Sequence, residues 1–241
     1  MTKLLTLFAL AGGLSAQVYY AKVEPLFKYT IAAAVAGQVV LADEALEGKV
    51  TDKTIIRLDD ALDKVNYDVA KESYKNLKDI YETKRDIYEK IVRMSTKSQN
   101  EKDTEKIALL TAKNNMESAR LQMESARDSL RKKTISGDNL YVYDVSVNEG
   151  QYVSPGTKLA ELHDTSGSRL VIFVTRDEIA GLTDGQVIVD GKAGEYRIDK
   201  KWNTADAEYI SSYRVELTGP APKTFSGLAK VEIMKPKQET K

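Results

Sequence analysis

Few side chains in this sequence could do chemistry, and their spacing does not bring them together. His163 is the single histidine, and cysteine is absent from all 241 residues. Thiol nucleophiles, iron–sulfur clusters, cysteine-based zinc sites and histidine-rich metal sites are therefore excluded. The carboxylates are spread along predicted helix faces, and no nucleophile, base and orienting group form a set. We predict that the protein is not an enzyme and has no catalytic residue, no cofactor and no metal site.

Two kinds of side chain could still bind a metal ion, and both have a simpler explanation. His163 stands beside Asp164 at the end of a predicted strand, and we expect it to be a surface turn residue. Met94, Met116 and Met123 could bind a soft metal, but helix packing already accounts for them.

The charge balance excludes other classes of function. The 36 basic and 36 acidic side chains cancel, so the protein has no net charge to attract nucleic acid or an acidic lipid surface. The 42% apolar and 30% charged content also excludes a polytopic membrane protein and general disorder. We predict no nucleic-acid partner.

The first 16 residues have the features of a secretory signal peptide. Lys3 precedes an apolar run, Leu4–Leu14, and the small residue Ala16 precedes Gln17. The run is shorter than the roughly 20 residues that a transmembrane helix needs. We predict a signal peptide over residues 1–16 and export to the periplasm; an uncleaved membrane anchor is the alternative.

The elements that must position any functional surface are two long helices, predicted over residues 59–133. No glycine or proline interrupts this block, and the pentapeptide MESAR occurs twice in it, seven residues apart. Tyrosines recur every seven residues in the first helix: Tyr67, Tyr74, Tyr81 and Tyr88. The second helix has a heptad of apolar positions: Leu109, Ala112, Met116, Ala119, Met123, Ala126 and Leu130. This spacing predicts an antiparallel coiled-coil hairpin.

The turn of this hairpin is marked by Ser98 and Glu101. A serine followed three residues later by glutamate forms a capping box, which starts the second helix at about residue 99. Each arm then has roughly 34 to 38 residues and a length of about 50–57 Å.

A repeated half-motif flanks the hairpin. Glu47-Gly48-Lys49-Val50 and Glu149-Gly150-Gln151-Tyr152-Val153 each precede a threonine and an apolar strand, and a further strand precedes each copy. The two copies predict two strand–turn–strand units that are separated by the helices.

With its flanking strands, this pattern resembles the split lipoyl domain of periplasmic adaptor proteins, the membrane fusion proteins of the HlyD type. The run Arg169–Val174, the segment Leu182–Val187 with its Gly185-Gln186 and the segment Ser226–Ile233 are similar to the β-barrel that follows in that family. The resemblance implies an α+β fold: a lipoyl-like β-sandwich split by a long antiparallel helical hairpin and followed by a small β-barrel.

The resemblance also implies domain boundaries. The split lipoyl-like domain would comprise residues 30–58 and 134–164, the hairpin 59–133, the barrel 165–235 and a tail 236–241. The family's membrane-proximal domain could form only in rudimentary form, from Gln17–Tyr29 and the last residues.

The function that the resemblance implies is assembly. An adaptor links an inner-membrane efflux pump to a TolC-like outer-membrane channel, and several copies, a hexamer or a trimer of dimers, form a ring. The residues implied for docking on the channel lie at the hairpin tip: Tyr88, Ile91, Met94, Ser95 and Ser98. This sequence departs from the family's tip motif, arginine-x3-leucine-x6-serine, because Ile87 stands at the arginine position when Ser98 is the serine. An alternative register with Lys84, Tyr88 and Ser95 keeps the charge and the serine but loses the aliphatic residue. A plain capping role for Ser98 therefore stays open.

Other functions remain as alternatives. Biotin or lipoyl carriers share the half-motif but need a modifiable lysine where this chain has the helices. A coiled-coil periplasmic scaffold or chaperone would explain the helices but not the paired half-motifs. Among pumps, the resistance-nodulation-division (RND) type is favoured over a MacB-like ABC exporter.

Overall fold

The computed structural model describes residues 16–206, 208–209 and 211–234. It divides into two compact units, which are described separately: one comprises Tyr29–Leu162, and the other comprises the residues up to Lys28 and those from His163 onward. No helix in the described ranges is long and apolar enough to cross a membrane. The predicted signal peptide lies outside the described residues apart from Ala16, and the predicted tail lies outside them entirely.

The first unit contains two facing sheets of short strands. One sheet includes β4 (Val50–Thr51), β7 (Leu140–Val145) and β9 (Lys158–Val174), with β2 (Glu24–Ala32) paired to β9. The other has the order β6 (Thr134–Ser136), β5 (Thr54–Leu58), β3 (Gly37–Ala42) and β8 (Tyr152–Val153). A short 3-10 helix, η1 (Glu44–Leu46), follows β3. Alternate side chains such as Val39, Ile56, Val142 and Leu159 point inward and form one buried cluster. The predicted β-sandwich is confirmed.

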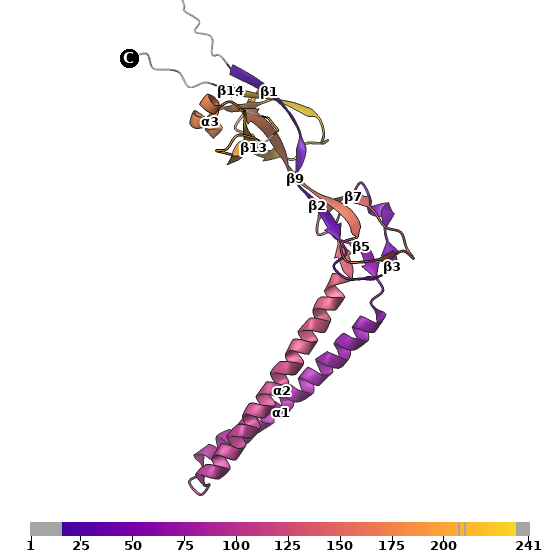
Figure 1. Ribbon diagram of the computed structural model, residues 1–241, viewed down its shortest axis with the longest axis vertical. Coiled ribbons are helices and arrows are strands. Elements are labelled where there is room, and N and C mark those ends of the chain that lie inside the picture. The colour runs from indigo at the N-terminus through magenta and orange to yellow at the C-terminus, as the bar shows by residue number, and fades with distance from the viewer. Residues whose placement is uncertain (1–15, 207, 210, 235–241) are drawn as a thin grey trace, which may run out of the picture. The chain divides into compact units, whose positions relative to one another are not determined.

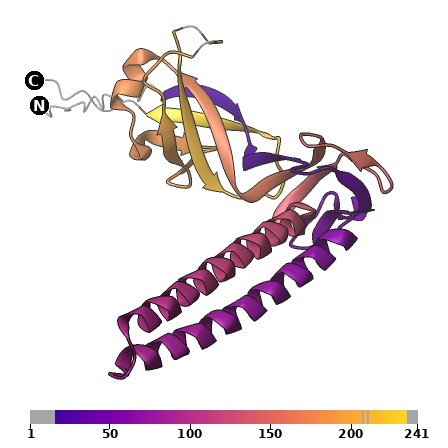
Figure 2. The same ribbon diagram turned by 60° about the horizontal axis from the view of Figure 1, so that its bottom comes forward.

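The hairpin is inserted between the two halves of this sandwich. Helix α1 spans Ala61–Arg93 and helix α2 spans Gln99–Lys132, and they lie side by side (Figures 1 and 2). With 33 and 34 residues, each arm is about 50 Å long. The predicted antiparallel hairpin is confirmed, with arms at the short end of the expected range.

The second unit contains two further groups of paired strands. One sheet has the order β1 (Ala16–Lys22), β14 (Leu228–Met234), β10 (Val187–Val189) and β11 (Lys192–Ala193). The other contains β12 (Arg197–Lys201), β13 (Tyr213–Pro220) and the second half of β9. Helix α3 (Arg176–Gly181) and the 3-10 helix η2 (Asp184–Gln186) connect them. We expected a small β-barrel here, but within the described residues the hydrogen-bonded ladders stay in two sheets and do not close.

Strand β1 contributes to this second unit. It pairs with β14 along its whole length, from Ala16 opposite Met234 to Lys22 opposite Leu228. The Tyr19 hydroxyl donates a 2.6 Å hydrogen bond to Glu178 of α3, and burial, followed by this hydrogen bond, raises the pKa of Tyr19. Residues we had considered for a rudimentary membrane-proximal domain thus complete the core of this unit, where Ala21 is buried.

His163 is not the surface turn residue that we expected. It is 7% exposed and lies inside β9, which continues through Asp164 and Gly167 to Val174 without a break. The polar residues after Leu162 suggested a turn, but they are part of the continuous strand β9. Ser168, which is fully buried there, shares a 2.7 Å hydrogen bond with the Tyr196 hydroxyl.

Candidate functional site at the hairpin tip

The seam between the two helices holds the tip in place. The predicted heptad of α2 lies on this seam: Ala112 and Ala119 are the buried residues of the hairpin, and the other heptad positions are half-buried. The four tyrosines of α1 are half-buried as well. Counted from the turn, Tyr74 and Tyr81 are level with Ala119 and Ala112, so small side chains leave room for large rings. The seven-residue spacing in both helices keeps large and small residues at matching levels along the seam.

The turn runs from Met94 to Ser98, and a complete capping box closes it. The Ser98 amide and hydroxyl donate to the Glu101 carboxylate at 2.9 and 3.0 Å, and the Glu101 amide donates to Ser98 Oγ at 3.3 Å. Lys97 adds a 2.8 Å bond to the same carboxylate. These hydrogen bonds, from Lys97 first and then from Ser98, lower the pKa of Glu101 to about 2. The predicted start of the second helix at residue 99 is confirmed.

The five residues predicted for the tip lie in the last turn of α1 and in the loop, but in different environments. Met94 is 47% exposed, and Ser95 and Ser98 are exposed. Tyr88 and Ile91 are half-buried. Ile91 is three residues after Tyr88 and shares the side of α1 that the seam partly covers. Ile91 is therefore a weaker candidate for contact with a partner than Met94.

Two apolar residues that the sequence analysis did not select are more exposed than Ile91. Val92 is 43% exposed and Ile87 is 36% exposed. With Met94 they are exposed apolar residues near the end of the hairpin, on more than one side of α1, and we call these three residues the tip patch. For Ile87 and Met94 the sequence pattern could have indicated this exposure. They are seven residues apart and lie on a different side of α1 from the tyrosines.

The two half-motifs are related by matching hydrogen bonds. The Gly48 amide donates to the Val142 carbonyl at 2.9 Å, and the Val142 amide donates to Lys49 at 3.0 Å. The Gly150 amide donates to Val39 at 2.8 Å, and Val39 donates to Gln151 at 2.8 Å. The turn of each half-motif is therefore hydrogen-bonded to the strand that precedes the other half-motif. Both glycines have a positive φ, 77° and 84°, which only glycine adopts without strain.

This internal symmetry places two similar apolar patches on opposite sides of the sandwich. Val50 and Tyr143 are exposed on the outer face of the sheet that contains β4 and β7. Tyr152 and Val40 are exposed at the equivalent positions on the sheet that contains β3 and β8. We call them patch 1 and patch 2. Since the two sheets pack face to face, the patches point away from each other.

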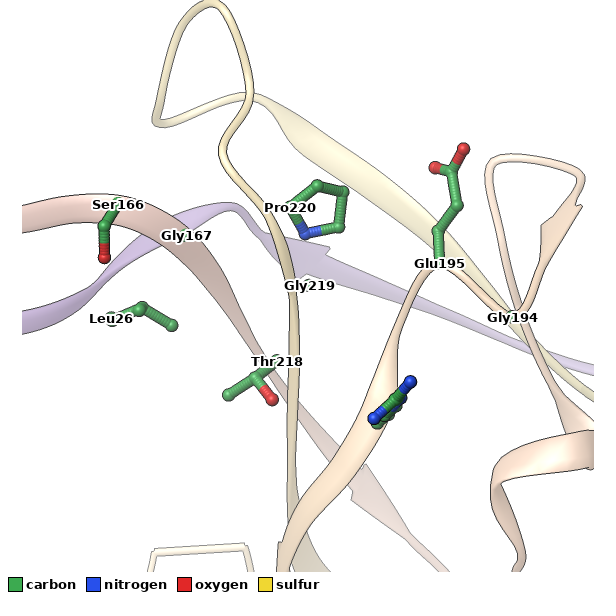
Figure 3. A pocket seen from close by; sticks show the side chains of 9 residues that line it. Leu26, Ser166, Gly167, Gly194, Glu195, Thr218, Gly219 and Pro220 are labelled. Carbon is green, nitrogen blue, oxygen red and sulfur yellow. The ribbon is translucent and has the colours of Figure 1, made fainter.

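A surface hollow in the second unit does not have the features of a ligand site. It measures about 690 Å³ and lies among Leu26, Ser166, Arg197 and Pro220 (Figure 3). Packing explains two of its glycines, because a Cβ would lie 2.6 Å from the Tyr196 ring at Gly219 and 2.9 Å from the Gly219 carbonyl at Gly167. The third, Gly194, has a positive φ of 80°. Within the ranges that the structure describes, no three metal-binding side chains come together.

No family model and no curated protein sequence matches this chain, but solved structures do. A putative efflux transporter from Bacteroides eggerthii is 15% identical, over 93% of this chain and 70% of that one, with a TM-score of 0.62. The membrane fusion protein Spr0693 from Streptococcus pneumoniae is 11% identical, over 92% and 100%, with a TM-score of 0.59. A MacA–MexA chimera containing the Pseudomonas aeruginosa MexA α-hairpin domain is 16% identical, over 91% and 80%, with a TM-score of 0.63. The chain therefore has the fold of these proteins.

Proposed function

We propose that this chain is a periplasmic adaptor of the membrane fusion protein family, which links an inner-membrane efflux pump to a TolC-like outer-membrane channel. One observation carries the proposal: a rigid hairpin of about 50 Å is inserted between two halves of a sandwich that hold each other by matching hydrogen bonds. A likeness to a membrane fusion protein over 92% of the chain supports it.

The role is assembly, not catalysis. The chain exports no molecule and transforms none; its surfaces connect other proteins. The transported substrates would be drugs or other small molecules. We favour a pump of the RND type, with a MacB-like ABC exporter as the alternative; a hairpin of this size is expected for both classes and is shorter than that of type I secretion adaptors. The protein would act in the periplasm after removal of its signal peptide and would be held at the inner membrane by the pump.

Patches 1 and 2 support assembly into a ring. An apolar patch on each of two opposite sides allows patch 1 of one copy to contact patch 2 of the next. Such head-to-tail contacts close into a ring when a whole number of copies completes one full turn. A hexamer or a trimer of dimers satisfies this condition.

The tip patch would contact the channel. Small apolar anchors at the centre of an interface contribute a large share of its binding energy, and Val92 and Met94 are exposed at the end of the hairpin. A coiled-coil scaffold or chaperone would explain the helices but not the paired half-motifs.

The experiment compares two valines of the same helix in cells that depend on the protein for drug resistance. Val92→Asp places a charge in the tip patch, and we expect export to fall by at least about tenfold, the effect of losing one anchor. Val69→Asp is the matched control, because Val69 is also an exposed valine of α1, at 63%, but lies toward the base. Equal export by both variants would contradict docking through the tip and would favour the scaffold alternative.

A further inference from the structure

The base of the hairpin is held differently from the rest of its length. Near the beginning of α1 the apolar residues face solvent: Leu62, Val65 and Val69 are 71%, 57% and 63% exposed. A hollow of about 710 Å³ opens there between residues of both helices. Charged side chains line most of it, among them Asp60, Lys64 and Arg127. The seam that packs the rest of the hairpin does not explain how this part of α1 is fixed.

Lys133 supplies the connection. It is the residue after the last turn of α2, and its ammonium group donates to the Asp59 carbonyl at 2.7 Å and to the Asp63 carboxylate. These bonds join positions 74 and 70 residues apart in the chain. The Lys133 and Asp63 side chains are only 15% and 25% exposed, so solvent and salt screen the pair less than a typical surface pair.

Backbone hydrogen bonds also connect Lys133 and Asp59 to strands of the sandwich. The Leu58 amide of β5 donates to the Lys133 carbonyl at 2.9 Å, and the Asp59 amide donates to the Gln38 carbonyl of β3 at 2.8 Å. The Asp59 carboxylate also accepts a 3.1 Å hydrogen bond from the amide of Ala61, the first residue of α1. The start of α1, the end of α2 and β5 therefore meet at Lys133, and Asp59 connects this point to β3.

We infer that Lys133 is a positioning residue: it latches the first turn of α1 to the end of α2 and thereby fixes how the hairpin leaves the sandwich. Its importance for function rests on the proposed adaptor role, in which the hairpin must present its tip in a defined direction. Without the ammonium group, the hollow, which charged side chains line, leaves little apolar packing to keep the base closed, whereas the seam still holds the tip half together.

The experiment measures distances between spin labels in the full chain, which lacks native cysteines and therefore needs no background removal. One pair, at Val65 and Ser125, reports on the base, and a second, at Thr83 and Leu110, reports on the tip half. In Lys133→Met, we expect the distance distribution of the base pair to lengthen and broaden, and that of the tip-half pair to stay unchanged. Lys133→Arg keeps a donor of similar length and should restore the native distribution.

An unchanged base distance in Lys133→Met would overturn the latch, whatever happens to export. The same variant is then assayed for drug export, and we expect a loss that Lys133→Arg reverses. Normal export with an open base would overturn the positioning role. If the unmodified protein supports no export while the base opens in Lys133→Met, the adaptor function fails and the latch stands, so the two failures are distinguishable.

Discussion

At the scale of single residues, Ser98 and Glu101 show what a local motif can predict. A capping box depends on residues three apart and on the backbone between them, so the start of α2 could be predicted without knowledge of the rest of the fold. The environment of Ile91 could not be predicted in this way. It depends on which side of α1 the seam covers, and that is decided by the packing of two helices along their whole length.

The acid titration of Glu101 is a prediction at this scale. Its pKa in the folded protein, about 2, lies below the ordinary 4.5 because Lys97 and Ser98 hydrogen-bond to the ionised carboxylate. The stabilisation is therefore complete above pH 4.5 and is lost as the pH falls from about 4.5 toward 2. We expect the Glu101 carboxyl carbon to titrate in that low range in an NMR experiment.

The matched variant is Glu101→Gln, which still accepts hydrogen bonds but cannot titrate. Its tip amide shifts should stay constant between pH 5 and pH 3, whereas those of the unmodified protein begin to move. Titration of Glu101 at its ordinary 4.5 would contradict the bonding described for the turn.

At the scale of elements, the helices could be predicted better than the strands. Tyrosine recurs every seven residues at four positions and alanine at three, and neighbouring residues determine a helix. Strand β1 has seven residues, and its partner β14 lies more than 200 positions further along the chain. Nothing local identifies such a pair. The same limit explains His163, since the long strand β9 is maintained by partners on both sides and not by its own polar sequence.

The close approach of the two helices gives a prediction about the seam. Ala119 is 3% exposed, so the larger side chain in Ala119→Leu should overpack the seam and cost about 1–3 kcal/mol of unfolding free energy. Thermal unfolding followed by helical circular dichroism measures the loss. The control is Leu121→Ala in the same helix: Leu121 is 67% exposed, and a change there should stay within about 0.5 kcal/mol. If both variants melt at the same temperature, α1 does not pack closely on Ala119.

At the scale of the whole molecule, the repeated half-motif connects sequence, fold and assembly. The repeat predicted two related units, and the structure shows matching hydrogen bonds between them. The outward positions of patches 1 and 2 follow from this symmetry, although the sequence analysis did not select them. They could have been found by comparing the two copies, because Val50 and Tyr152 occupy the same place after the motif glycine.

Head-to-tail assembly through these patches makes a specific prediction about mixtures. Tyr143→Ser weakens patch 1 and Tyr152→Ser weakens patch 2, so neither variant alone should form rings. In an equal mixture, one intact patch 2 can meet one intact patch 1, and growth stops at that dimer. Mass photometry should therefore show monomers for each variant alone and dimers for the mixture. Full rings in either variant, or monomers only in the mixture, would contradict this mode of assembly.

Cross-linking from the tip to an outer-membrane channel in living cells tests the adaptor function most directly. A photoreactive residue replaces Met94, which is exposed in the tip patch, and a second strain carries it at Val69 near the base. The account predicts a cross-link from position 94 to a channel protein of the outer membrane and none to that protein from position 69. If the protein is folded and exported but position 94 never cross-links to a channel, the hairpin does not dock there and the adaptor function is contradicted.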